Sequence, residues 1–324
     1  MAFDCLCIGG AAADGSFRLA SPAVLGTSNV ATAGSGFGGV ARNVAESLAR
    51  LGAHVGLLSA VGADAAGWEL VEHATAAGID AGLVRVIPGE QTARYIALID
   101  PEGELVIGIN AMSVLAGIRP EDISDAPLEE ARWVFAECNL DAETLLAVIE
   151  RRRAGGVFRL AIDAISTPKA TRLPIDLSGI DLLCGNVDEG NAILGVAEPS
   201  TPEGAMALAL GLVARGAGAA MISIGSGGCV VASAAGVWAV GAVPAAVVDV
   251  TGAGDARIAG TLQGLLAGEP LHEAARRGSL LAALAAESPT PIDPALAPRR
   301  VAASENRLAE ASLTPMANPR GPLP

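Results

Sequence analysis

The sequence predicts an α/β protein with a doubly wound, mostly parallel sheet between two layers of helices. Apolar runs bounded by Gly, Asn or Asp alternate along the chain with segments of helical spacing. Solid apolar runs are typical of parallel strands buried on both faces, and helices must cover such a sheet on each side. The composition agrees, with 51% hydrophobic residues, only 3% aromatic residues and 40 glycines. We therefore expect a core of small, closely packed aliphatic side chains.

Strands and helices are expected to alternate over most of the chain. The apolar runs predicted as buried strands cover residues 3–8, 55–60, 133–136, 160–165, 182–184 and 219–224. The segments with helical spacing cover residues 40–51, 65–77, 142–153, 202–215, 253–266 and 271–286. This alternation is what a doubly wound sheet requires.

Two segments break the alternation, residues 14–36 and residues 92–110, because polar and apolar positions alternate within them. Strands with one solvated face fit a small antiparallel sheet that projects from the main body and can act as a lid over a pocket. We expect one domain over residues 1–298 and a tail over residues 299–324. Prolines accumulate after about residue 289 and the hydrophobic period fades there.

The charge balance argues against polymeric nucleic acid as a partner. The chain has 21 basic and 35 acidic residues, a net charge of −14, and Lys169 is its single lysine. No basic face is available to neutralise a phosphate backbone. Residues 216–248 carry no charge, but the glycines and Pro244 within them favour strands and turns over a membrane span.

The cysteines and the N-terminal residues indicate a cytoplasmic protein. The cysteines are dispersed within apolar runs without metal-ligand spacing and are interpreted as buried, reduced thiols; they are Cys5, Cys7, Cys138, Cys184 and Cys229. The first residues hold an acid at Asp4 and no basic stretch, so we expect no signal peptide.

The strongest motif covers residues 249–260, which follow an apolar run and open a helix. Gly252, Ala253 and Gly254 leave the backbone bare, so their N–H groups can point at one anion at the positive end of the helix dipole. Asp255 then lies in the first helical turn, where its carboxylate can accept a proton from a hydroxyl group. Phosphoryl transfer tolerates such a weak base because positioning dominates that reaction. The alternative is a glycine turn with Asp255 as an ordinary first-turn helix charge.

This segment resembles the C-terminal signature of the ribokinase-like (PfkB) carbohydrate and nucleoside kinases, which has the form DTTGAGD, a short apolar step and AG. The resemblance implies a ribokinase-like fold, with Asp255 as the catalytic base and the glycines as an anion hole for the transferred phosphate. It also implies that Asp249 and Thr251 help to hold a monovalent cation such as K⁺. Arg257 stands where the family usually has an apolar residue; an outward-facing position on the helix would accommodate it.

A second motif lies at residues 38–52, where a glycine pair opens an amphipathic helix. Backbone can approach a sugar closely at Gly38 and Gly39, and Asn43 lies on the first turn to hydrogen-bond it. The pattern resembles the other PfkB signature, although an ordinary glycine entry to a packed helix fits the same letters. Asp14 matches the family aspartate that binds ribose hydroxyls, and a turn-forming Asp is the alternative.

The nucleotide side of the site is carried by two further patterns. Asn186 and Glu189 match the family NxxE motif, which orders the water shell of Mg²⁺ and the ATP phosphates; a helix capping box is the alternative. Ser223, Gly225 and Gly228 match a family loop that lies along the nucleotide phosphates. A hairpin turn explains the same residues, and both interpretations can hold together.

Several segments look most like the pseudouridine kinases within the family, namely residues 38–43, 105–107, 139–144 and 165–170. The resemblance implies ATP-dependent phosphorylation of the 5′ hydroxyl of a ribosyl nucleoside, with Mg²⁺ and K⁺ as cofactors, in a homodimer. Asn139 and Lys169 are candidates for base contacts. Alternatively, Asn139 caps the following helix and Lys169 is a solvated surface charge.

Two departures from that subfamily leave other acceptors open. Ala12 stands where such kinases usually have Asn, and Asn110 where an Asp is common. Ribokinase, fructokinase or another nucleoside kinase is therefore the first alternative. A non-catalytic sugar or nucleoside sensor on the same scaffold is the second.

Overall fold

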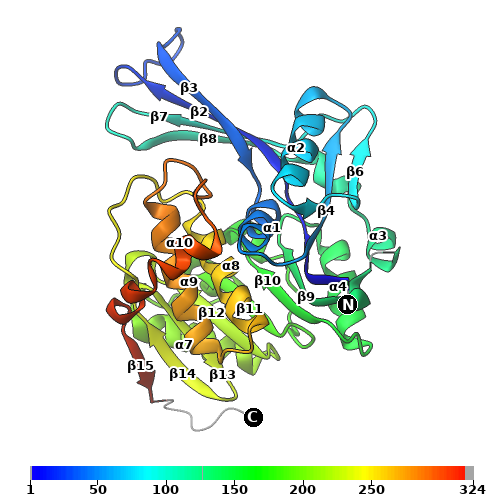
Figure 1. The fold of residues 1–324 in the computed structure, drawn as a ribbon, viewed down its shortest axis with the longest axis vertical. Coiled ribbons are helices and arrows are strands. Elements are labelled where there is room, and N and C mark those ends of the chain that lie inside the picture. The colour runs from blue at the N-terminus through cyan, green and yellow to red at the C-terminus, as the bar shows by residue number, and fades with distance from the viewer. Residues whose placement is uncertain (1, 126, 318–324) are drawn as a thin grey trace.

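The computed structural model describes residues 2–125 and 127–317, and it confirms the three-layer α/β architecture (Figure 1). The main sheet has eleven strands in the order β15-β14-β13-β12-β11-β10-β9-β1-β4-β5, with β6 paired to β4. Pairing is parallel from β12 to β5 and antiparallel among β12, β13, β14 and β15. The bounds are β1 Phe3–Ile8, β4 Val55–Gly62, β5 Ile79–Asp80, β6 Val84–Ile87, β9 Ala131–Glu137, β10 Arg159–Asp163, β11 Leu182–Asn186, β12 Ala219–Ser223, β13 Cys229–Ser233, β14 Gly236–Val240 and β15 Leu313–Met316.

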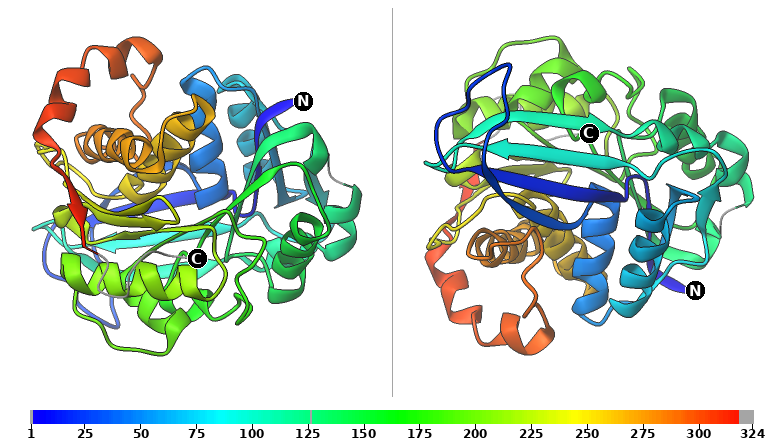
Figure 2. Two further views of the ribbon diagram at one scale, coloured as in Figure 1. Left: turned by 90° about the horizontal axis from the view of Figure 1, so that it is seen from below. Right: turned by 90° about the horizontal axis from the view of Figure 1, so that it is seen from above.

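Helices cover both faces of this sheet (Figure 2). One layer holds α1 Val40–Arg50, α2 Ala65–Ala76, α8 Ala253–Leu266 and α9 Leu271–Ala286, and the opposite layer holds α4 Ala142–Arg153, α6 Val187–Leu194 and α7 Pro202–Ala214. Shorter pieces are α3 Pro120–Asp125, α5 Thr167–Ala170, α10 Pro298–Ala302 and the 3₁₀ turns η1 Ser113–Gly117, η2 Leu128–Glu130, η3 Gly225–Gly227 and η4 Glu305–Glu310.

Strand β1 shows why an uninterrupted apolar run is needed. Cys5 and Cys7 pack into the core under α1 and α8, whereas Leu6 and Ile8 pack into the core under α4 and α7. All four side chains are fully buried because successive residues of a strand point to opposite faces. The five cysteines are free and buried, as predicted. No helix among the described residues is long and apolar enough to cross a bilayer.

The second sheet is the predicted lid and extends away from the main body (Figure 1). It contains β2 Ala12–Leu19, β3 Ala31–Gly38, β7 Arg94–Ile99 and β8 Leu105–Ala111, in the order β3-β2-β7-β8. Each hairpin is antiparallel, while the central pair β2–β7 is parallel. The lid is thus assembled from two hairpins that lie far apart in the sequence.

The C-terminal residues differ from the expected tail. Residues 298–316 form α10, η4 and β15, and β15 pairs with β14 as the outermost strand of the main sheet. The weak hydrophobic period has a physical reason, because β15 is a short edge strand that accommodates Pro315, as edge strands can. Residues 318–324 lie outside the described residues.

Candidate active site

A cavity of about 750 Å³ opens where the parallel strands end and helix α8 begins. Polar side chains line one part of it, among them Asp163, Asn186, Glu189 and Asp255. Apolar residues of the 242–250 segment and of α9 line the rest. The carboxyl ends of parallel strands are where ligands bind in open α/β sheets, so this cavity is the candidate active site.

The first turn of α8 presents backbone N–H groups at the edge of this cavity. Gly252 precedes the helix with a φ of 79°, and a Cβ there would collide with the Pro291 carbonyl group, so only glycine fits. Within the described residues, the N–H groups of Gly252, Gly254 and Asp255 have no protein acceptor, but that of Ala253 donates to the Val250 carbonyl (3.2 Å). The predicted cradle therefore needs a correction, because Ala253 closes the turn and Asp255 supplies a free N–H group.

Asp255 of the motif at residues 249–260 contacts the motif at residues 38–52 through Asn43. Its Oδ2 accepts a hydrogen bond of 2.7 Å from Nδ2 of Asn43 on α1. Burial raises the pKa of Asp255 to about 7; the Asn43 bond opposes this rise, and the charges of Glu137 and Asp14 add to it. A carboxyl group with a pKa near neutral pH can exchange a proton with a hydroxyl group.

Asp14 lies beside the glycine pair. Its carboxylate occupies the space where a Cβ of Gly38 would be, and Gly39, with a φ of 94°, passes so close to Gly10 that a Cβ would overlap its backbone. Burial raises the pKa of Asp14 to about 6, against the influence of Arg42. Its Oδ1 is buried without a hydrogen-bond partner among the described residues, and such an unpaired acceptor is suited to a ligand hydroxyl.

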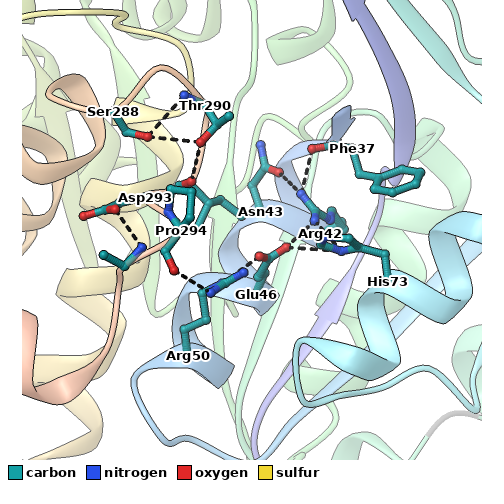
Figure 3. Close-up of polar contacts among 12 residues, drawn as sticks. Phe37, Arg42, Asn43, Glu46, Arg50, His73, Ser288, Thr290, Asp293 and Pro294 are labelled. Carbon is teal, nitrogen blue, oxygen red and sulfur yellow. Dashed lines mark hydrogen bonds and ion pairs between the residues drawn. The ribbon is translucent and has the colours of Figure 1, made fainter. Parts of the chain in front are cut away.

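Arg42 fixes the orientation of Asn43 (Figure 3). Its Nη1 donates to the Phe37 carbonyl oxygen of β3 (2.7 Å) and to Oδ1 of Asn43 (3.0 Å). Because Oδ1 of the amide accepts from Arg42, Nδ2 is the end that faces Asp255. Arg42 also pairs with buried Glu46 and contacts Nδ1 of His73 (3.1 Å). Arg42 was not predicted from the sequence, although its place directly before Asn43 in the predicted helix was a signal.

Glu137 and Asn139 at the end of β9 form a cluster with Lys169 of α5. Glu137 is fully buried and accepts from the backbone N–H groups of Gly10 and Asn139. Lys169 donates to Oδ1 of Asn139. Burial raises the pKa of Glu137 and lowers that of Lys169. Glu137 was not predicted from the sequence, in which an acid directly after the apolar run 133–136 was the available signal.

Both alternatives considered for this cluster are wrong. The following helix α4 is capped by Asp141, whose side chain accepts from the Thr144 N–H group, and not by Asn139. Lys169 is half-buried and hydrogen-bonded, so it is not a solvated surface charge.

Asn186 and Glu189 begin α6 with a full capping box. Oδ1 of Asn186 accepts from the Glu189 N–H group (2.9 Å), and Oε2 of Glu189 accepts from the Asn186 N–H group (2.8 Å). Asp163 of β10 is buried nearby, and burial together with the Glu189 and Asp255 charges raises its pKa well above the usual range. Ile165, two residues after Asp163, lines the cavity. Its φ of 67° is a strained backbone conformation for a β-branched residue.

The Ser223 loop is a hairpin that also lines the cavity. Ile222 pairs with Val230 across antiparallel β12 and β13, as the turn interpretation predicted. Gly225 and Gly228 have φ values of 56° and 92°, which glycine adopts without strain. Oγ of Ser223 donates to the Gly185 carbonyl (3.3 Å). Ser223 and Gly225 line the cavity.

The remaining predicted positions are spread around this centre. Oδ1 of Asp249 accepts from the Thr251 N–H group (2.8 Å) in a local turn. Ala12 is buried opposite Gly38, whereas Asn110 is exposed on β8 opposite Tyr95. The described residues contain no group of three or more His, Cys, Asp or Glu side chains arranged to hold a metal ion directly.

Arg257 does not face outward, which corrects the expectation for this position. It is only 8% exposed, lines the cavity, and its Nη1 donates to Oγ of Ser279 on α9 (3.0 Å).

Comparison with known proteins identifies the class to which this fold and site belong. Residues 4–298 match the pfkB family carbohydrate kinases, and the chain belongs to this family. It is therefore a sugar or nucleoside kinase, a phosphotransferase with a small-molecule acceptor.

Two relatives illustrate the range of acceptors in the family. The chain is 31% identical over 243 residues to the pseudouridine kinase of Escherichia coli K12, covering 74% of this chain and 76% of the relative. It is 29% identical over 268 residues to the ribokinase of Mus musculus, covering 78% and 79%.

Solved structures confirm the ribokinase-like fold. Ribokinase from Giardia lamblia aligns with a TM-score of 0.82 at 19% identity, covering 95% of this chain and 99% of that one. A carbohydrate kinase from Agrobacterium tumefaciens aligns with a TM-score of 0.78 at 27% identity, covering 95% and 99%.

Replacing Arg42 should destabilise the protein strongly. In Arg42→Met, Glu46 remains almost fully buried and loses one of its two arginine partners, so we expect a loss of about 3 kcal/mol in the free energy of unfolding. Urea denaturation measures this loss. The matched control is Arg119→Met, which breaks an exposed ion pair with Glu121 and should change stability by less than about 0.5 kcal/mol. Equal effects of the two substitutions would contradict this role of Arg42.

Proposed function

We propose that the protein phosphorylates the 5′ hydroxyl of a ribosyl nucleoside with ATP, and that pseudouridine is its acceptor. The observation that carries the proposal is the hydrogen bond from Asn43 to Asp255, which joins the two signature motifs beside the unpaired N–H groups of α8. The relative named pseudouridine kinase supports the choice of acceptor.

In this proposal the acceptor lies between the lid and the first turn of α8. Asp14 accepts hydrogen bonds from the ribose hydroxyls through its unpaired Oδ1, and Gly38 leaves the room that the Asp14 carboxylate occupies. Asn43 contributes a polar group to the same side. Asn139 and Lys169 face the base, whose polar edges suit an amide and an ammonium group.

Asp255 acts as the base and α8 as the anion hole. The 5′ oxygen attacks the γ-phosphorus of ATP, its proton passes to the Asp255 carboxylate, and the bond from the γ-phosphorus to the bridging oxygen breaks to release ADP. Charge that develops on the transferred phosphoryl group is stabilised by the N–H groups of Gly252, Gly254 and Asp255.

The nucleotide occupies the cavity beside the Ser223, Gly225 and Gly228 loop. Asn186 and Glu189 lie where they can order the water shell of Mg²⁺, and a bound cation would favour the charged form of the neighbouring Asp163 carboxyl group. Bound Mg²⁺ would neutralise phosphate charge. Asp249 and Thr251 are the residues proposed to help to hold K⁺.

The lid and the quaternary structure complete the proposal. The lid hairpins within residues 14–36 and 92–110 close over the acceptor bound to the main domain, which extends to β15, and they exclude water, which would otherwise compete as acceptor. The exposed apolar side chains of β8, Val106, Ile107 and Ile109, support a homodimer that pairs through the lid. The free buried thiols suit the reducing cytoplasm.

A second acceptor class is favoured by two positions that depart from the pseudouridine kinase pattern. Ala12 is buried at the start of the lid and Asn110 is exposed on β8, so neither supplies the side chain usual in that subfamily. Ribose or fructose is the alternative acceptor. The sensor hypothesis remains the third, and loss of turnover in a single Asp255 variant separates it from the kinases.

An acceptor panel tests the substrate. With ATP and Mg²⁺ present, we expect ADP release with pseudouridine to give a kcat/KM at least about 10-fold above ribose, fructose, adenosine and uridine, because a matched hydrogen-bonding pocket discriminates by more than 1.4 kcal/mol. A higher value for ribose or fructose would move the assignment to the second acceptor class.

Removing the base tests the mechanism. Asp255→Asn keeps the shape and the Asn43 contact region but cannot accept the proton, so kcat should fall about 10³-fold while nucleotide binding stays within about 3-fold. Unchanged turnover in Asp255→Asn would remove the mechanism. Absence of turnover in the wild-type protein with every acceptor, together with retained binding, would favour a sensor.

The pH dependence follows from the raised pKa of Asp255. The protonated carboxyl group is inactive, so kcat/KM should rise with pH through about 7. Asp14→Asn removes the other carboxyl group, which has a pKa of about 6. It should keep the rise but move it to lower pH, because the Asp14 charge adds to the raised pKa of Asp255.

Unfolding gives an independent check of the same shift. The folded-state pKa lies above the unfolded value of about 3.9, so this group's contribution to stability is full below that value and is lost as pH rises through about 7. Asp255→Asn should remove this part of the pH dependence of unfolding.

For the activity measurement, a kcat/KM that stays flat between about pH 5.5 and 8.5 would contradict the assignment of Asp255 as the base.

A further inference from the structure

Among the described residues, Arg257 is the single basic residue that lines the cavity. The acidic residues that line the same cavity are Asp163, Glu189 and Asp255. A polyanionic ligand bound in a cavity with three acidic side chains needs cationic charge close to its own oxygens. Among the described lining residues, Arg257 is the one side chain that can supply it.

Arg257 has no protein counter-ion within the described part of the chain. Its guanidinium group lies no closer than 4 Å to any described carboxylate, since no such ion pair is formed. Its guanidinium group donates a hydrogen bond to the neutral hydroxyl group of Ser279. A guanidinium group is always charged, and a buried charge without an ionic partner is costly. The site is therefore incomplete without an anion.

The position of Arg257 on α8 indicates where that anion lies. Ala253, Gly254 and Arg257 are three and four residues apart, so they share one helix face, and all three line the cavity. Arg257 thus lies one turn beyond the N–H groups at the start of the helix. Ser279 holds its guanidinium group from α9, on the side where the cavity becomes apolar.

We propose that Arg257 binds the polyphosphate chain of the nucleotide donor and is the counter-ion that the cavity supplies. The planar guanidinium fork matches phosphate oxygens, which accept its N–H donors in pairs. The inference rests on the proposed function, because it takes the ligand of this cavity to be a nucleotide. It adds a binding residue at the position where the family signature usually has an apolar side chain.

Binding of ADP and adenosine to Arg257→Met tests this assignment by titration calorimetry. Loss of a hydrogen bond to a charged group should weaken ADP binding about 10- to 100-fold, whereas adenosine, which has no phosphate, should bind within about 2-fold of wild type. Equal ADP affinity in wild type and variant would overturn the proposal. An equal loss for ADP and adenosine would also overturn it, since Arg257 would then contact the base or the ribose.

Stability of the ligand-free protein separates binding from folding. Because Met removes a buried charge without an ionic partner, Arg257→Met should melt at or above the wild-type temperature. Arg257→Lys is the second variant: it keeps the charge and loses the fork, so ADP should weaken about 3- to 10-fold with adenosine unchanged. If Arg257→Met does not fold, unchanged ADP affinity in Arg257→Lys overturns the proposal.

The proposed function is tested on the wild-type protein and not on the Arg257 variants. Wild-type protein that binds no ADP, or that phosphorylates no acceptor, would contradict the proposed nucleoside kinase activity. The inference on Arg257 fails through the comparison of variant with wild type, when the wild type binds ADP normally.

Discussion

The active site depends on one hydrogen bond, from the amide of Asn43 to the carboxylate of Asp255. It links α1, which enters from the lid, to α8, which opens at the end of the sheet. The bond has one orientation because Arg42 occupies the other end of the amide, and Arg42 is itself held by Glu46 and by the Phe37 carbonyl group. The Asp255 carboxylate is therefore placed beside unpaired N–H groups by a chain of buried contacts that begins in the lid.

Unfavourable burial of carboxylates is the cost of this arrangement. Asp14, Glu137, Asp163, Glu189 and Asp255 all have raised pKa values, in each case mainly because burial disfavours the charged form. Burying these carboxylates lowers the stability of the folded protein at the place where a ligand needs charged groups, as is common at functional sites. Bound cations and ligand hydroxyls can restore this stability, so we expect the free protein to be less rigid here than the complex.

The local motifs could be predicted from the sequence, but the contact between the two motifs in the folded chain could not. The strands, the helices and the glycine turns follow from periodicity and bare backbone, and Asn43 and Asp255 were each found in a local pattern. Their contact spans 212 positions, which spacing alone does not reveal. Glu137 was missed because an acid at a strand end is ordinarily solvated. Arg257 was misplaced because a charged helix residue ordinarily faces water. Strand β15 was missed because four edge residues that include a proline leave too weak a pattern.

The parallel pairing of β2 with β7 determines when the lid can assemble. Asp14 pairs in register with Tyr95, and the chain between them forms α1, β4, α2 and β6 of the main body. Each hairpin can form early from its own neighbours, but joining them requires closing a long loop, whose entropic cost falls once that intervening segment is folded. The four-stranded lid is therefore a late product of folding, and a nascent chain completes it only after the intervening part of the main sheet exists.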